Sequence, residues 1–92
     1  MTSVRLNTRF LFEEEIEGLD ERFLSNIVSF ALCSFYGQVG SAKLQYEITE
    51  ISTERLEIVM LMAEENFRKV SAALALLGRY AGVRVKIAVT RS

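Results

Sequence analysis

Apolar residues recur in this chain with two different periods, and the order of those periods limits the folds that it can adopt. From Val4 to Phe12 they occupy alternate positions, with Thr8 as the polar member of the set, which indicates a strand with one buried face. From Phe23 to Phe35 they recur at helical spacing, after Asp20 as an N-cap and before Gly37 as a left-handed stop. We therefore expect a strand followed by a helix of about four turns.

A hairpin is expected next. After a loop over residues 37–41, alternation resumes over residues 43–49, and a polar break at residues 52–54 precedes a second arm that ends near Met62. Val59 and Leu61 make this arm apolar on both sides, which favours a strand that is covered on both faces.

A second helix and a last strand complete the pattern. Glu64 and Glu65 suit the positive end of a helix that stops near residues 78–82, and residues 83–89 alternate again. The order β-α-β-β-α-β predicts an α+β fold of the ferredoxin-like or RNA-recognition-like kind, an antiparallel sheet with two helices on one face. With the strand order 4-1-3-2, the last strand lies beside the first.

Length and composition indicate one α/β domain over residues 1–92. Half of the residues are apolar and none is proline, so the chain can form one core and offers no linker. The uncharged run Val70–Gly78 is too short to span a bilayer, and the N-terminus has no apolar signal core, so we expect an intracellular protein without membrane contact. Cys33 lies in the apolar helical pattern, where we expect it to act as a small hydrophobe.

Charge is distributed unevenly along the chain. Up to Glu65 there are 12 acids and 5 bases, a net −7, whereas residues 66–92 carry six bases and no acid. If the last strand lies beside the first, Arg84 and Lys86 stand next to Arg5 and Arg9 on the helix-free face and form a basic patch suited to phosphates. The alternative is a solvated charged face without a ligand. The candidate RNA-binding residues are Arg5, Arg9, Arg68, Lys69, Arg79, Arg84, Lys86 and Arg91.

The open face is expected to bind phosphates rather than to stack bases. Phe10, Phe12 and Tyr46 occupy the same alternate positions as the buried aliphatic residues, which leaves the open face polar. Contact with phosphates and with the shape of a folded RNA should depend strongly on salt.

No set of residues predicts a catalytic site, a metal site or a cofactor. The chain has no histidine, and the adjacent carboxylates of residues 13–15 would point to opposite faces of a strand. Gly37 and Gly40 follow a helix and precede a strand, the reverse of a phosphate-binding loop. An acid–base or metal enzyme that uses Glu14 is the least favoured alternative.

The second helix offers a candidate partner-binding surface. Opposite its core positions, Ala72 and Ala75 lie between Arg68 and Arg79, about 16 Å apart on a helix, and Leu76 lies on one flank. Small residues allow close approach of another backbone, so Ala72, Ala75 and Leu76 are the predicted partner contacts. The alternative is that the alanines serve helix propensity alone.

Three segments, Phe35–Leu44, Val70–Gly78 and Val83–Val89, carry a family resemblance. They resemble the small α/β protein subunits of Pop/Rpp type from archaeal and eukaryotic ribonuclease P and from ribonuclease MRP. The chain differs from that pattern near Met60, where members often carry an arginine, and at Thr90–Ser92, where members often end with a Ser-Gly-Thr-like sequence.

The resemblance implies a non-catalytic subunit of a ribonucleoprotein that removes the 5′ leader of precursor tRNA, with the Mg²⁺-dependent hydrolysis carried out by the RNA. The implied partners are structured RNA (ribonuclease P or MRP RNA and precursor tRNA) and another ribonuclease P protein subunit, in a homo- or heterodimer. The implied location is the nucleus or nucleolus in a eukaryote and the cytoplasm in an archaeon. The alternative is a ferredoxin-like module for protein interaction or dimerisation that does not bind RNA.

Overall fold

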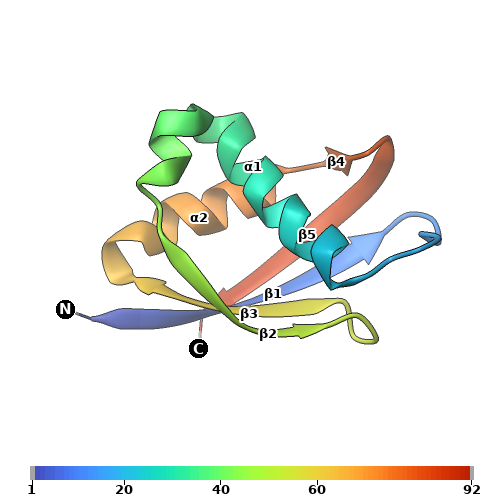
Figure 1. Ribbon diagram of the computed structural model, residues 1–92, viewed down its shortest axis with the longest axis horizontal. Helices are drawn as coiled ribbons and strands as arrows, with labels where there is room; N and C mark the ends of the chain where they lie inside the picture. The colour runs from blue at the N-terminus through green and yellow to red at the C-terminus, as the bar shows by residue number, and fades with distance from the viewer. Residues whose placement is uncertain (1, 92) are drawn as a thin grey trace.

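The computed structural model describes residues 2–91, which form a five-stranded antiparallel sheet and two helices (Figure 1). The strands follow the order β2-β3-β1-β5-β4, so the long strand at the C-terminal end lies beside β1 as expected. The predicted ferredoxin-like α+β fold is confirmed, with β4 as an additional short strand. The elements are β1 (Ser3–Phe12), α1 (Glu21–Ala42), β2 (Tyr46–Ser52), β3 (Glu57–Ala63), α2 (Glu64–Leu76), β4 (Arg79–Tyr80) and β5 (Val83–Arg91).

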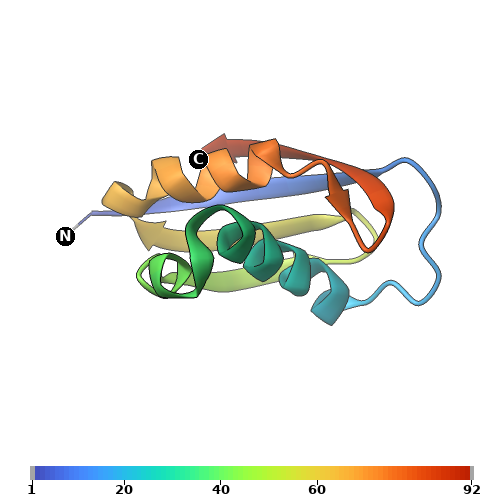
Figure 2. The same cartoon turned by 90° about the horizontal axis from the view of Figure 1, so that it is seen from above.

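Both helices cover the same face of the sheet, and the other face is left open (Figures 1 and 2). α2 packs on β1 and β5, and α1 lies over the β2 side of the sheet. Phe10 of β1, Met60 of β3 and Leu74 of α2 are fully buried between the two layers. The strands alternate because one side of each contributes to this core and the other side faces away from the helices.

Helix α1 begins where the sequence predicts and ends later. The Asp20 side chain accepts a hydrogen bond of 2.8 Å from the backbone N–H of Phe23, which makes Asp20 the N-cap. Gly37 breaks the helix with φ 73° and ψ 175°, but helical structure resumes and continues to Ala42, so the predicted loop over residues 37–41 is wrong. The Tyr36 hydroxyl donates a hydrogen bond of 2.7 Å to the Lys69 carbonyl of α2. This bond connects the residue before the break in α1 to the second helix.

The same helix corrects two expectations. The expected absence of a membrane-spanning segment rests on the run Val70–Gly78, but the uncharged run Phe23–Ala42 is longer. By length and composition alone, α1 could cross a bilayer. It packs as a core helix, since Ile27, Ala31 and other residues of one face are buried. Cys33 lies on the opposite side of the helix and is exposed, so its predicted place in the apolar set is wrong.

A short hairpin, missed in the sequence, follows α2. Tyr80 of β4 pairs with Val83 of β5 across a two-residue turn, in which Ala81 (φ 53°) and Gly82 (φ 80°) both have left-handed backbone conformations. Two positive φ angles define the turn type that matches the twist of paired strands. The sequence predicted residues 78–82 only as the end of the second helix.

Candidate nucleic-acid interface

Five basic residues lie on the side of the sheet that faces away from the helices. Arg5 and Arg9 of β1, and Arg84 and Lys86 of β5, are exposed and alternate with buried core residues. Arg79 lies directly opposite Arg84 in the β4–β5 ladder, so its side chain is on the same side. We call this set the basic strip: Arg5, Arg9, Arg79, Arg84 and Lys86.

The basic strip is long rather than compact. Lys86 lies opposite Leu11, two residues from Arg9, so these two bases are diagonal neighbours as expected. Arg84 lies at the level of Glu13, whose backbone N–H donates to the Arg84 carbonyl. Arg5 is eight residues from Glu13 along β1, which corresponds to about 27 Å. The prediction that Arg84 stands beside Arg5 is therefore wrong, because the register places them at opposite ends of the sheet.

The β4–β5 end of the strip concentrates positive charge. Arg79 and Arg84 are direct cross-strand partners, an arrangement that destabilises a hairpin by roughly 0.2–1 kcal/mol. The Glu13 carboxylate lies 3.8 Å from the Arg84 guanidinium, but both side chains are exposed and such a pair stabilises little. An anion between the two side chains would offset this repulsion, so this end is the part of the strip best suited to a phosphate.

The other three candidate bases lie on the helix side of the molecule. Arg91 donates to the Glu64 carboxylate over 3.0 Å, and its guanidinium lies 5.3 Å from the centre of the Phe67 ring. Arg68 and Lys69 are exposed on α2. The eight predicted RNA-binding residues therefore divide between two surfaces, and two of them, Arg84 and Arg91, are already paired with an acid.

Charge also divides the open face into two halves. Glu47 and Glu50 of β2 stand on the half away from β5, and Glu57 of β3 lies at the boundary, directly opposite Arg9 of the basic strip. Val59 and Leu61 lie among them and are half-buried, although both helices cover the other face, so the prediction that β3 is covered on both sides is wrong. A polyanion is attracted to the β1, β5 and β4 half and repelled by the β2 half.

Aromatic side chains lie on the helix side of the sheet, as predicted. Phe10 is fully buried, and Phe12 and Tyr46 pack against the same core. Tyr80 of β4 contacts Phe23 of α1 edge to face, with 5.4 Å between ring centres. The open face between residues 2 and 91 therefore has no aromatic platform on which bases could stack.

The exposed face of α2 matches its prediction in part. Ala72 and Ala75 are exposed, and Leu76 is 68% exposed. The helix ends at Leu76, so Arg79 does not lie on this face, and the predicted bracket of two arginines on one helix is wrong.

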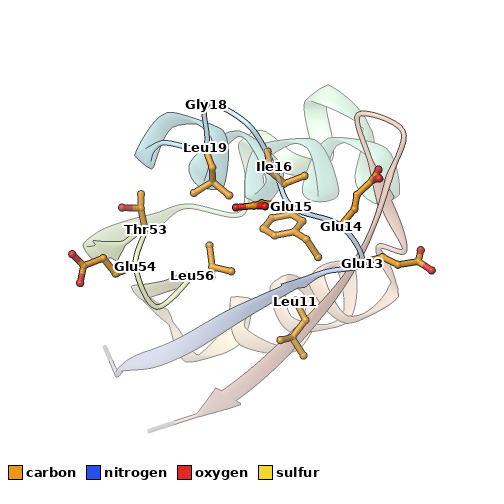
Figure 3. Close-up of a pocket in the computed structure, with 11 residues that line it drawn as sticks. Leu11, Glu13, Glu14, Glu15, Ile16, Gly18, Leu19, Thr53, Glu54 and Leu56 are labelled. Atoms are coloured by element: carbon orange, nitrogen blue, oxygen red, sulfur yellow. The ribbon is translucent and has the colours of Figure 1, made fainter.

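The acidic residues after β1 line a pocket of about 710 Å³ that the sequence did not predict (Figure 3). It lies between the β1–α1 loop and the β2–β3 turn, two segments that are distant in the sequence. Within residues 2–91, no group of three or more His, Cys, Asp or Glu side chains is arranged to hold a metal ion. We call it the loop pocket, lined by Leu11, Phe12, Glu13, Glu14, Glu15, Ile16, Gly18, Leu19, Thr53, Glu54 and Leu56.

Comparison with known proteins decides the family. The model of the Rpp14/Pop5 family matches residues 5–92, nearly the whole chain. The chain belongs to the Rpp14/Pop5 family. The predicted resemblance to the Pop/Rpp-type protein subunits of ribonuclease P is therefore confirmed. No curated protein matches the chain.

Two positions at which this Rpp14/Pop5 chain departs from the expected pattern now have a structural place. Met60 is fully buried in the core, where it has no access to RNA. Thr90 is exposed at the end of β5, Arg91 is paired with Glu64, and Ser92 lies outside the described residues.

Proposed function

We propose that this ribonuclease P subunit is a non-catalytic, RNA-binding component of ribonuclease P or MRP that supports 5′ processing of precursor tRNA. The observation that carries the proposal is the direct opposition of Arg79 and Arg84, with Lys86 and Arg9 next along the same surface. Two like charges at directly opposite positions of a hairpin are unfavourable, and an anion between them would offset the repulsion. The phosphates of a structured RNA supply such anions.

The basic strip suits contact with a nucleic-acid backbone and not with bases. Its side chains are arginine and lysine on a sheet face that has no aromatic platform, so recognition depends on charge and on the shape of the RNA. The chain also lacks histidine, the residue that most often transfers protons at neutral pH. We assign the hydrolysis to the RNA, as the family membership implies, and to the protein the binding and orientation of that RNA.

The experiment replaces two bases of the strip with acids. Arg84→Glu with Lys86→Glu should abolish retention of ribonuclease P RNA by the purified chain and lower precursor-tRNA cleavage by the reconstituted ribonucleoprotein. Arg22→Glu with Arg55→Glu is the matched control, because both residues are exposed outside the strip and the net charge changes equally. Equal loss of RNA in both variants, or in neither, would contradict the proposal.

A protein partner is assigned to the exposed face of α2. Ala72 and Ala75 allow close approach of another backbone, and Leu76 supplies an exposed apolar side chain beside them. If the chain is instead an interaction module without RNA, the double reversal at Arg84 and Lys86 leaves assembly with the partner intact and wild-type chain retains no RNA. Assembly and RNA retention are therefore measured on the same samples.

A further inference from the structure

The loop pocket combines an apolar floor with an acidic rim. Ile16 and Leu19 of the β1–α1 loop and Leu56 of the β2–β3 turn line the pocket. Figure 3 shows the Glu15 side chain extended between Leu19 and Leu56, whereas Glu13 and Glu54 point away from the centre of the opening. These three apolar side chains remain half-buried, so an apolar ligand that enters the pocket removes further surface from water.

The charge around the pocket selects the ligand. Four glutamates line it, and no lysine or arginine does. Glu13 has Arg84 as a partner at 3.8 Å, whereas the ion pairs found among residues 2–91 include none for Glu14, Glu15 or Glu54. Four carboxylates repel phosphate groups, so the interior of the loop pocket is unsuited to RNA. They attract cations, and the floor beneath them attracts apolar groups.

We infer that the loop pocket binds an extended segment of a partner protein in which lysine or arginine alternates with aliphatic residues. Alternation on an extended chain directs the apolar side chains to the floor of the pocket, and the long flexible stems of lysine and arginine allow the cations to reach the carboxylates around it. The inference deepens the proposed function, since it names the chemistry of a segment that a protein partner supplies.

A second copy of this chain does not fit as the occupant. Its own stretch of alternating bases and aliphatic residues is β5, which is paired with β1 on one side and with β4 on the other. Its bases Arg68 and Lys69 are part of α2. Within residues 2–91 the chain therefore has no free basic and aliphatic segment to insert into a copy of itself.

The test measures binding of a labelled Lys-Leu-Lys-Val-Lys-Leu peptide to the full chain by fluorescence anisotropy at about 50 mM salt, where charge attraction is strong. Glu14→Lys with Glu54→Lys should lower the affinity at least tenfold. Ile16→Ser should lower it severalfold without a charge change, and Ile16 is absent from the core cluster, so folding is preserved. Glu47→Lys with Glu50→Lys, an equal charge change on β2, should leave it within about twofold.

Absent peptide binding, or an equal loss in the β2 control, would overturn the inference. A Lys-Ser-Lys-Ser-Lys-Ser peptide that binds as tightly would also overturn it, because the apolar floor would then play no part. RNA retention by the same variants separates this inference from the proposed function: the pocket variants should keep RNA, and Arg84→Glu with Lys86→Glu should keep the peptide. Loss of both ligands in one variant would contradict two separate sites.

Discussion

Neutralising the two facing arginines gives the most direct test of the proposal that the strip binds RNA. In Arg79→Ala with Arg84→Ala, two of the five strip bases are removed and the backbone ladder between β4 and β5 is kept. If each strip base contacts one phosphate, log K falls with log salt at a slope of about −4.5 for the wild type and about −2.7 for the variant. Between 50 and 200 mM salt, these slopes correspond to losses of roughly 500-fold and 40-fold in affinity.

The change in affinity should occur without a matching change in stability. Removing the facing charges relieves a repulsion of roughly 0.2–1 kcal/mol, and removing Arg84 from the Glu13 pair loses a contribution of similar size. The free energy of unfolding should therefore change by less than about 1 kcal/mol, as measured by urea denaturation.

The assay is filter binding of ribonuclease P RNA at several salt concentrations. Arg22→Ala with Arg55→Ala removes the same charge from exposed positions outside the strip and should keep the wild-type slope. A slope that is unchanged in the strip variant, or that falls equally in the control, would refute the assignment of phosphates to Arg79 and Arg84.

Three further predictions concern single residues. Thr8 is 1% exposed and its hydroxyl has no hydrogen-bond partner among the described residues, so Thr8→Val should raise the free energy of unfolding by about 1 kcal/mol, seen as a higher urea midpoint with an unchanged m-value. Ala81 has a left-handed backbone, so Ala81→Asn should raise the melting temperature and Ala81→Val should lower it, each through roughly 0.5–1 kcal/mol. Leu76→Glu should abolish co-purification with a protein subunit of the ribonucleoprotein while the circular dichroism spectrum stays unchanged, because Leu76 is 68% exposed; retained assembly would contradict the α2 interface.

The sequence predicted the sheet well because one side of each strand is buried. The alternation in β1, β3 and β5 records which side faces the core, and Asp20 marks the start of α1 through a local hydrogen bond. Such signals lie within a few residues of the structure that they predict.

The features that the sequence missed depend on contacts between distant residues. Helical structure resumes after Gly37 next to a hydrogen bond from Tyr36 to Lys69, 33 residues away, which no local pattern reveals. β4 is only two residues long, too short for an alternation to be visible. Its turn has Ala-Gly instead of the more usual Asn-Gly.

The candidate site was predicted in part for the same reason. Alternation placed Arg5, Arg9, Arg84 and Lys86 on the open face, and the structure agrees. The distance between Arg5 and Arg84 depends on the register of β1 against β5, which alternation does not specify. The position of Arg79 on the open face depends on β4, which the sequence did not predict. The loop pocket depends on two loops that are distant in the sequence and that the fold brings together.

Glu13 borders both surfaces, because it lines the loop pocket and also forms the ion pair with Arg84. A lysine of a docked protein segment that took over this carboxylate would free the guanidinium for a phosphate. The two ligands would then bind cooperatively. Thermodynamic reciprocity requires bound RNA to raise the affinity for the segment by the same factor by which the bound segment raises the affinity for RNA. One exposed ion pair would in this way favour assembly of the complete particle over either half-assembled complex.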